Sequence, residues 1–388
     1  MTLPLSYNMR NVRVRWRLTL LAVCGIALVV AVFSVLMAMS KGFATALRST
    51  GRADNAIVVT SGSSSELTSD VSLEHRNAIL ADKRLAHGPD GRALASWEWV
   101  AVMALPKRVG GRTNVTLGAV PPQAFEVRGG IQVTEGRRFT PGLDEVIVGR
   151  RILERVAGFE LGGTLRYRRT ECRIVGVFAS EGGAFESEVW GDYDRFRGLL
   201  NRGPGSSSLV VRLEDPAQVP ALDRWIRSQP GMALQALSER QYYDKQSGLV
   251  ATTLELLAGL VAVIMGVGAV FGAMNTMYAI VVTRTREIGT LRAIGFSRRA
   301  ILLSFVVESA CVALAGGVLG CLLAFPVHGF STGASNLQSF SEVAYAFRIT
   351  PTIMAASLVF ALVMGVAGGL LPAVRAARLP IAGAVREG

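Results

Sequence analysis

The chain has few of the side chains on which most enzymes and metal proteins depend. Its 388 residues include only three histidines and four cysteines, and 18% of them are charged. Three of the cysteines fall in apolar runs, so neither a disulfide framework nor a His/Cys metal site is expected. Soluble proteins are about a quarter charged. The low charge, together with 50% hydrophobic residues, therefore predicts membrane segments.

The sequence also lacks the common catalytic motifs. It contains no HExxH and no CxxC, and the absence of any Gly-Lys dipeptide excludes the P-loop of an ATPase. One GxSxG match begins at Gly329, but it follows an apolar run instead of the strand that a nucleophile elbow requires. We interpret it as a chance match. No catalytic residue, metal or cofactor is predicted in this chain.

Four apolar runs are each long enough to cross a bilayer as a helix, which takes about 20 residues. They cover residues 18–40, 249–283, 300–328 and 350–374. We therefore predict an α-helical membrane bundle of four transmembrane helices. A cleaved signal peptide is the alternative for the first run, but the apolar part of a signal peptide has only about 7–15 residues.

Positive charge lies beside these runs. Ten of the twelve net positive charges belong to residues 1–17, 284–299 and 375–388. Arg-rich segments favour the cytoplasmic side of a membrane. Both termini and the 284–299 loop are therefore predicted to be cytoplasmic, with residues 41–248 and 329–349 outside a bacterial inner membrane. This distribution indicates a multi-pass protein in lipid and argues against nucleic acid as a partner.

The second apolar run belongs to a helix too long for its membrane. Ser238 and Gln241 form a capping-box pattern, and no proline follows before Thr283. At 1.5 Å per residue the helix would measure on the order of 65–70 Å, against about 30 Å of hydrocarbon. Residues 238–248 are therefore predicted to form a stalk. A break near Gly248 is the alternative.

The region 41–248 is predicted to be a large mixed α/β extracytoplasmic domain between helices 1 and 2, with room for two lobes. Short β-branched or alternating stretches predict strands at 56–60, 100–105, 145–148, 173–178 and 209–213. Apolar residues at helical spacing predict helices at 72–85 and 216–228.

Two kinds of residue stand out inside the apolar runs. Glu255 and Glu308 are candidate functional carboxylates, because acids are rare in membrane helices. Glu308 could instead pair with an arginine near the cytoplasmic side. Glycines spaced four apart let helix backbones approach closely, and they predict packing within the bundle at Gly268, Gly272, Gly316, Gly320, Gly365 and Gly369.

One segment carries a specific resemblance. Residues 284–297 read Arg-Thr-Arg-Glu-Ile-Gly-Thr-Leu-Arg-Ala-Ile-Gly-Phe-Ser. This resembles the loop after the second membrane helix in MacB/FtsX/LolC-type (type VII) ABC transporter permeases, whose pattern is Arg-x-x-Glu-Ile-Gly-x-Leu-Arg-Ala-Ile-Gly. Residues 368–378 are similar to the end of the family's fourth helix, and 144–149, 161–164 and 174–177 to its outer domain. The resemblance covers the whole chain and is weakest at 50–130.

The resemblance implies a permease that works by mechanotransmission. Because the chain has no P-loop, it departs from the family members that carry a fused ATPase domain. A separate P-loop ATPase in two copies would then bind ATP and Mg. A second permease chain, like or related, would complete the machine. A short cytoplasmic helix at about 285–294 would present Ile288, Leu291 and Ile294 as one stripe to the ATPase. The implied coupling residues are Arg284, Arg286, Glu287, Ile288, Gly289, Leu291, Arg292, Ile294 and Gly295.

The role outside the membrane stays open at this point. Export or extraction of a lipoprotein, peptide or lipophilic compound is the first hypothesis, with a periplasmic adaptor, membrane-fusion protein or carrier as a further partner. The alternative is an FtsX-like regulator that activates a cell-wall hydrolase and moves no cargo. A membrane-anchored enzyme or receptor has no catalytic pattern to support it.

Overall fold

The computed structural model describes residues 16–336 and 338–379. Most of the predicted basic N-terminal segment and the end of the tail lie outside them. The chain divides into two compact units. The helical unit comprises residues up to Lys41, Thr253–Phe330 and Phe347 onward, and the α/β domain comprises Gly42–Thr252 and Ser331–Ala346.

Four long helices are apolar enough to cross a membrane. They are α2 (Trp16–Thr50), α8 (Glu239–Thr283), α10 (Arg298–Ala324) and α11 (Pro351–Arg378). The 45-residue α8 is unbroken, so the alternative of a break at Gly248 was wrong. Gln241 N–H donates to Ser238 Oγ over 3.2 Å at its start, as the capping pattern predicts. A 3₁₀ turn, η4 (Phe325–Val327), follows α10.

The helical unit packs through small residues. A Cβ at Gly320 would overlap α2, one at Gly316 would be in tight contact with α2, and one at Gly365 would overlap Ala313 of α10. Thr350 caps α11, its Oγ1 accepting from Ile353 N–H over 3.3 Å, ahead of the proline at the first helical position. All four helices line one small cavity of about 20 Å³. They therefore form one bundle.

The α/β domain contains one large sheet. Its strands run in the order β10-β1-β9-β2-β3-β8-β5-β7-β4, with β6 paired to β7. Only the β3–β8 and β5–β7 pairs are parallel. The strands are β1 (Asn55–Thr60), β2 (Ala95–Pro106), β3 (Arg112–Val120), β4 (Gln132–Gly136), β5 (Glu145–Gly149), β6 (Thr164–Tyr167), β7 (Thr170–Ala179), β8 (Glu188–Asp192), β9 (Ser208–Arg212) and β10 (Leu234–Ser238). All five predicted strands are present.

Short helices cover this sheet. They are α3 (Leu73–Leu80), α4 (Ala124–Arg128), α5 (Arg150–Arg155), α6 (Tyr193–Leu199) and α7 (Val219–Ser228), with 3₁₀ turns η1 (Glu66–Thr68), η2 (Ala184–Ser187) and η3 (Pro216–Gln218). Val219, Leu222 and Ile226 form the buried face of α7, as their spacing predicts. The helix predicted at 72–85 ends five residues early, at Leu80.

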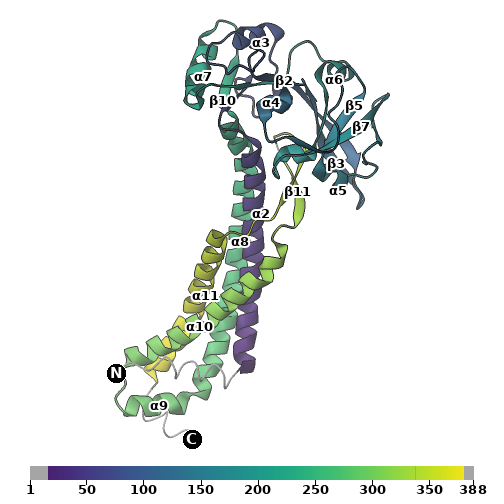
Figure 1. Ribbon diagram of the computed structural model, residues 1–388. Helices are drawn as coiled ribbons and strands as arrows, with labels where there is room; N and C mark the ends of the chain where they lie inside the picture. The colour runs from purple at the N-terminus through teal and green to yellow at the C-terminus, as the bar shows by residue number, and fades with distance from the viewer. Residues whose placement is uncertain (1–15, 337, 380–388) are drawn as a thin grey trace. The chain divides into compact units, whose positions relative to one another are not determined.

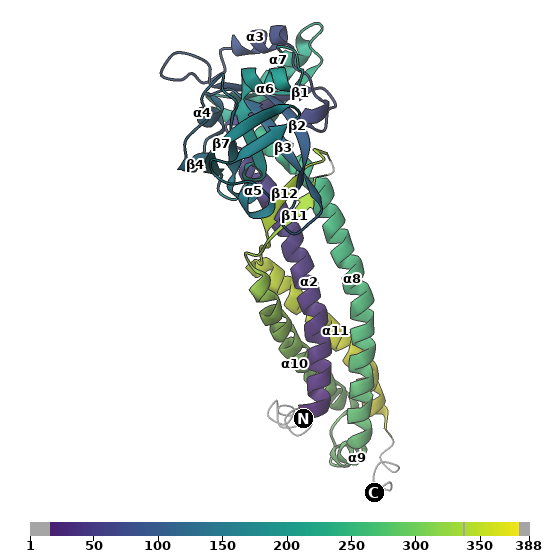
Figure 2. The same ribbon diagram turned by 90° about the vertical axis from the view of Figure 1, so that its right-hand side faces the viewer.

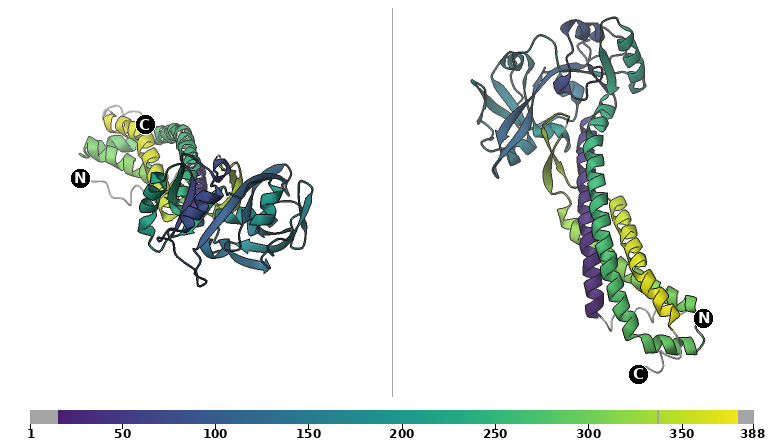
Figure 3. Two further views of the ribbon diagram at one scale, coloured as in Figure 1. Left: turned by 90° about the horizontal axis from the view of Figure 1, so that it is seen from above. Right: turned by 180° about the vertical axis from the view of Figure 1, so that it is seen from behind.

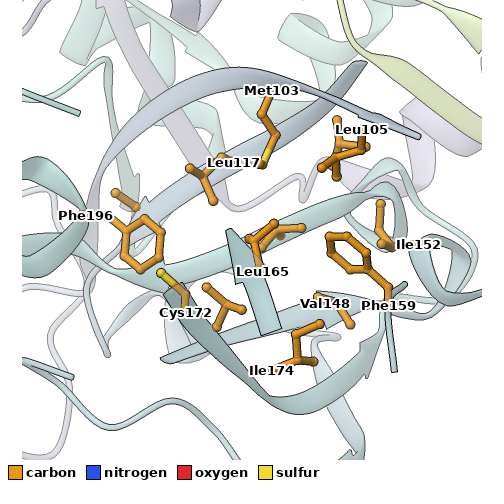
Figure 4. Close-up of a cluster of buried hydrophobic side chains, with 14 of the residues drawn as sticks. Met103, Leu105, Leu117, Val148, Ile152, Phe159, Leu165, Cys172, Ile174 and Phe196 are labelled. Atoms are coloured by element: carbon orange, nitrogen blue, oxygen red, sulfur yellow. The ribbon is translucent and has the colours of Figure 1, made fainter. Parts of the chain in front are cut away.

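Two hydrophobic cores divide the domain into two lobes. Strands β1, β9 and β10 with α3 and α7 enclose one core, and β2, β3 and β5–β8 with α5 and α6 enclose the other. Figure 1 shows α3 and α7 in one lobe and α5 and α6 in the other. In the second core, Leu117, Leu165 and Ile174 point into a common interior (Figure 4). β2 belongs to both lobes, because Ala95–Glu98 pair with β9 and Trp99–Pro106 with β3.

The 329–349 segment is a β-hairpin, not the plain loop that we expected. Strands β11 (Ser331–Ser335) and β12 (Glu342–Ala346) pair antiparallel. In sequence the hairpin connects α10 to α11, yet it belongs to the α/β domain. It lies beside β3 and α5 (Figure 2).

Candidate functional site

The predicted cytoplasmic loop begins with a sharp break in the helical backbone. At Arg284 the backbone leaves helical geometry, with φ −113° and ψ 13°, and α9 (Thr285–Ala293) follows. In Figures 1 and 3, α9 lies across the end of α8 and does not continue it. The short helix expected at about 285–294 is therefore present.

A buried ion pair fixes this break. The Arg284 guanidinium donates through Nη1 to Glu308 of α10, over 2.9 Å, and through Nε to Glu287 of α9, also over 2.9 Å. It also stands 5.0 Å from the centre of the Phe305 ring. The Arg284 and Glu308 side chains are 5% and 4% exposed. Glu308 thus pairs with an arginine, the second of the two roles considered for it.

The two faces of α9 have different surroundings. Ile288 is 1% exposed and packs with Met277, Ile301 and Ala376, residues of α8, α10 and α11. Leu291 is partly buried against the same cluster. Ile294 is 69% exposed. The expected stripe of three apolar side chains is therefore divided. Ile288 and Leu291 pack into the core of the helical bundle, and only Ile294 is exposed.

The exposed face of α9 consists of other members of the motif. Arg286, Thr290 and Ala293 recur at helical spacing and are exposed, and Ile294 lies beside them. Gly289 is buried with Ile288 on the inner face. The segment therefore presents a small mixed surface with one cation and one large apolar side chain.

The end of α9 is fixed as firmly as its start. Gly295 has φ +107°, and Phe296 N–H donates to Leu291 O over 3.1 Å, a glycine-terminated helix end. Arg292 donates to the backbone oxygen of Ala377 near the end of α11 over 2.8 Å. Contacts thus tie α9 to α10 through Arg284 and to α11 through Arg292.

The remaining predicted residues of the bundle have different environments. Gly369, like Gly365, faces α10, where a Cβ would overlap Ser309. A Cβ at Gly268 or Gly272 would meet nothing within 4 Å. Both glycines line an open groove of about 340 Å³ between α2 and α8. Glu255 is exposed and accepts a hydrogen bond from Ser40 Oγ over 3.1 Å.

The first residue of α8 is held by a buried charge network in the α/β domain. Arg128 donates to Glu239 over 2.7 Å and to both oxygens of Glu98, over 2.9 Å and 2.6 Å. Glu239 also accepts from Arg52 N–H and from Asn55, each over 3.0 Å. All three charged side chains are at most 4% exposed. Because the partners lie up to 187 residues apart, sequence gave no signal for this network.

The β11–β12 hairpin is bonded to the α/β domain through one carboxylate. Glu342 accepts from Lys107 Nζ over 2.8 Å, from Thr113 Oγ1 over 2.5 Å and from Arg155. Ala344 N–H donates to Ser187 Oγ over 2.9 Å. This attachment was not predicted, because the two partners of each bond are more than 150 residues apart.

A small polar cavity of about 30 Å³ lies between the hairpin and the domain. Its lining includes Asn336 of the hairpin, Gln246 of α8, and the carboxyl groups of Glu66 and Glu188. Burial raises the pKa of Glu188 to about 8, although the Trp190 indole N–H and the charge of Arg128 lower it in part. Burial also raises the pKa of Glu66. Both groups therefore hold protons more tightly than exposed glutamates.

The part of the chain that the structure describes contains no group of three or more His, Cys, Asp or Glu residues placed to hold a metal ion. Cys172 is buried in the second core of the α/β domain, and Cys321 of α10 is buried in the helical bundle.

Comparisons with known proteins decide the family. The family model of the MacB-like periplasmic core domain matches residues 19–229, and that of the FtsX-like permease C-terminal domain matches residues 259–381. The chain is a member of the MacB/FtsX-type permease family. The resemblance noted in residues 284–297 and in the outer domain is thereby confirmed.

Several relatives illustrate this. The chain is 29% identical to the macrolide export ATP-binding/permease protein MacB of Burkholderia pseudomallei and 31% identical to that of Hahella chejuensis. Each alignment covers 71% of this chain and 43% of the relative, so the chain spans less than half the length of these proteins.

Two solved structures are also similar. The periplasmic region of MacB from Actinobacillus actinomycetemcomitans is 13% identical, with a TM-score of 0.37, and the match covers 54% of this chain and 95% of that one. The extracellular domain of the transporter YknZ from Gram-positive bacteria is 18% identical, with a TM-score of 0.36, and the match covers 47% and 99%.

Proposed function

We propose that this permease is the membrane subunit of an ABC transporter driven by a separate ATPase. Two ATPase copies would bind ATP and Mg, and their closure would move α9. The chain would lie in the bacterial inner membrane with α9 in the cytoplasm. The Arg-rich ends of the long helices support this orientation, because Arg298 begins α10 and Arg375 and Arg378 end α11 near α9.

The observation that carries the proposal is the two-faced environment of α9. Its inner face is locked to α8, α10 and α11, while Arg286 and Ile294 remain exposed. A partner that displaced this exposed face would move all three helix ends together. The surface is small, so it fits a groove in a soluble protein better than a broad interface.

The unbroken α8 supports mechanotransmission to a site outside the membrane. At 1.5 Å per residue its 45 residues measure about 67 Å, more than twice the hydrocarbon thickness. Motion at Arg284 would thus be transmitted along α8 to the region beyond the bilayer. Cargo would be handled there and would not need a channel between the helices. The groove at Gly268 and Gly272 supports a second permease chain, since small residues favour close helix contacts in lipid.

A pull-down with single-site variants tests the proposal. The tagged chain is isolated from its native cells in mild detergent, and co-purifying proteins are identified by mass spectrometry. Wild type should recover a P-loop ATPase, and Ile294→Asp or Arg286→Glu should recover at least tenfold less. Leu143→Asp is the matched control, because Leu143 is 50% exposed in the α/β domain. If wild type recovers no ATPase even after cross-linking, the proposal is wrong.

The same preparation separates transport from regulation. A co-purifying membrane-fusion protein or lipoprotein carrier would support export or extraction of cargo. A peptidoglycan hydrolase would instead support a regulator that moves no cargo.

A further inference from the structure

A polar cleft of about 500 Å³ opens at the seam between the two lobes of the α/β domain. It includes Trp99, the first residue of β2 that pairs with β3, whereas Glu98 still pairs with β9. The segment Ser69–Leu73, which leads into α3, lines the cleft, as do residues 201–205, which follow α6. Cavities of 300–1,000 Å³ at the junction of two structural units are typical of small-ligand sites.

The walls of this cleft are held in place. Val71 and Ser206 exchange backbone hydrogen bonds of 2.7 Å and 2.9 Å, which join the two lining segments. The Tyr193 hydroxyl donates to Pro204 O over 3.1 Å. A Cβ at Gly205 would come within 2.6 Å of Val71 O. The cleft is therefore a formed feature of the domain.

Two side chains of opposite charge line the cleft and do not pair with each other. Arg202 is exposed, with its guanidinium 5.0 Å from the centre of the Trp99 ring. Asp70 is also exposed. Neither Arg202 nor Asp70 takes part in any of the ion pairs found among the described residues. The Trp99 side chain is nearly buried, and its indole N–H has no acceptor within the described part of the chain.

We propose that this cleft binds a zwitterionic ligand, a short peptide with free amino and carboxyl ends. The carboxylate would pair with Arg202 and the ammonium with Asp70. A purely anionic ligand would be repelled by Asp70, and a purely cationic one by Arg202. Asn201, which also lines the cleft, can both donate to and accept from a peptide group.

This inference does not depend on the proposed function, because ligand binding in the cleft requires no ATPase. Its failure would leave the assignment of α9 untouched, and loss of the ATPase interaction would leave the cleft unchanged.

Isothermal titration calorimetry of the full chain in lipid nanodiscs tests whether the cleft binds a zwitterionic peptide. The probe is trialanine, and the blocked forms are N-acetyl-trialanine, trialanine amide and the doubly blocked peptide. We expect trialanine to bind at least tenfold more tightly than either singly blocked form. Arg202→Gln should abolish the preference for the free carboxyl end, and Asp70→Asn the preference for the free amino end.

Arg224→Gln is the matched control, since Arg224 is an exposed arginine of α7 outside the lining of the cleft. It should bind trialanine as wild type does. Thermal unfolding without peptide checks that each variant is folded. The proposal is overturned if wild type gives no binding at millimolar trialanine, if blocked peptides bind equally well, or if both folded cleft variants keep wild-type affinity.

Discussion

The guanidinium of Arg284 and the carboxylate of Glu308 lie 2.9 Å apart inside the helical bundle, 24 residues apart in sequence. The pair joins the break between α8 and α9 to the middle of α10. Breaking a buried pair by removing one partner leaves an uncompensated charge, whereas replacing both with apolar residues does not. This asymmetry makes the pair testable.

Glu308→Leu should lower the free energy of unfolding by roughly 3–5 kcal/mol, because the Arg284 guanidinium would stay buried without the carboxylate of Glu308. The double variant Arg284→Met/Glu308→Leu should recover most of that loss. Thermal unfolding in nanodiscs measures both. Equal destabilisation in the single and double variants would show that the ion pair is not the cause.

Gly365→Ala should destabilise the bundle by about 1–3 kcal/mol, since its methyl group would overlap Ala313 of α10. Gly268→Ala is the matched control, because its methyl group meets nothing within 4 Å in this chain. The measurement is the unfolding midpoint in dilute detergent. A destabilised Gly268→Ala would mean that Gly268 is covered, in solution, by something outside this chain.

Glu342→Ala should release the β11–β12 hairpin, because Lys107, Thr113 and Arg155 lose their shared acceptor. Hydrogen bonds to charged groups contribute about 1.5–3 kcal/mol each, so amide exchange in residues 331–346 should accelerate at least tenfold. Ser331→Ala, at an exposed position of the same hairpin, is the control. Unchanged exchange would show that the hairpin is held by other contacts.

Glu188 should make stability depend on pH. Its folded pKa is about 8 against an ordinary value of 4.5, so the folded protein keeps a proton that the unfolded chain loses. The contribution of Glu188 to the free energy of unfolding therefore declines as the pH rises from 4.5 to about 8, and it is constant above pH 8. Besides burial, the groups that shift the pKa of Glu188 are Trp190 and Arg128, which lower it, and Glu66 and Glu98, which raise it.

The variant Glu188→Gln is neutral at every pH and should remove this decline. We expect its unfolding midpoint to match wild type at pH 5 and to exceed it by several degrees at pH 8.5, a difference of a few kcal/mol at most. The exposed Glu135→Gln should behave as wild type. A parallel pH dependence in wild type and Glu188→Gln would contradict the assignment.

Elements defined by their own residues could be predicted from the sequence. Apolar runs specified the long helices, and the absence of proline predicted an unbroken α8. The strands rich in Val and Ile were predicted for the same reason, since side chains of that shape favour extended backbone.

Features that depend on distant partners could not be predicted. β11 reads Ser-Thr-Gly-Ala-Ser, which has little strand propensity of its own, and it forms because β12 pairs with it. The burial of Ile288 and the exposure of Ile294 could not be predicted from their spacing, because burial depends on how α9 packs against the other helices. Glu308 was expected to be special, but several arginines lay within reach, and only the structure assigns Arg284 as its partner.

The buried contacts of Glu239 determine how α8 can move. The residue is fully buried and bonded to β2 through Arg128 and Glu98, and directly to Asn55 of β1. Separate elements of the domain (β1, β2 and α4) therefore hold the first turn of α8. It cannot spin about its own axis or slide lengthwise without leaving charges unpaired. If motion passes along α8 as proposed, the part of the α/β domain that holds Glu239 would move with the first turn of the helix.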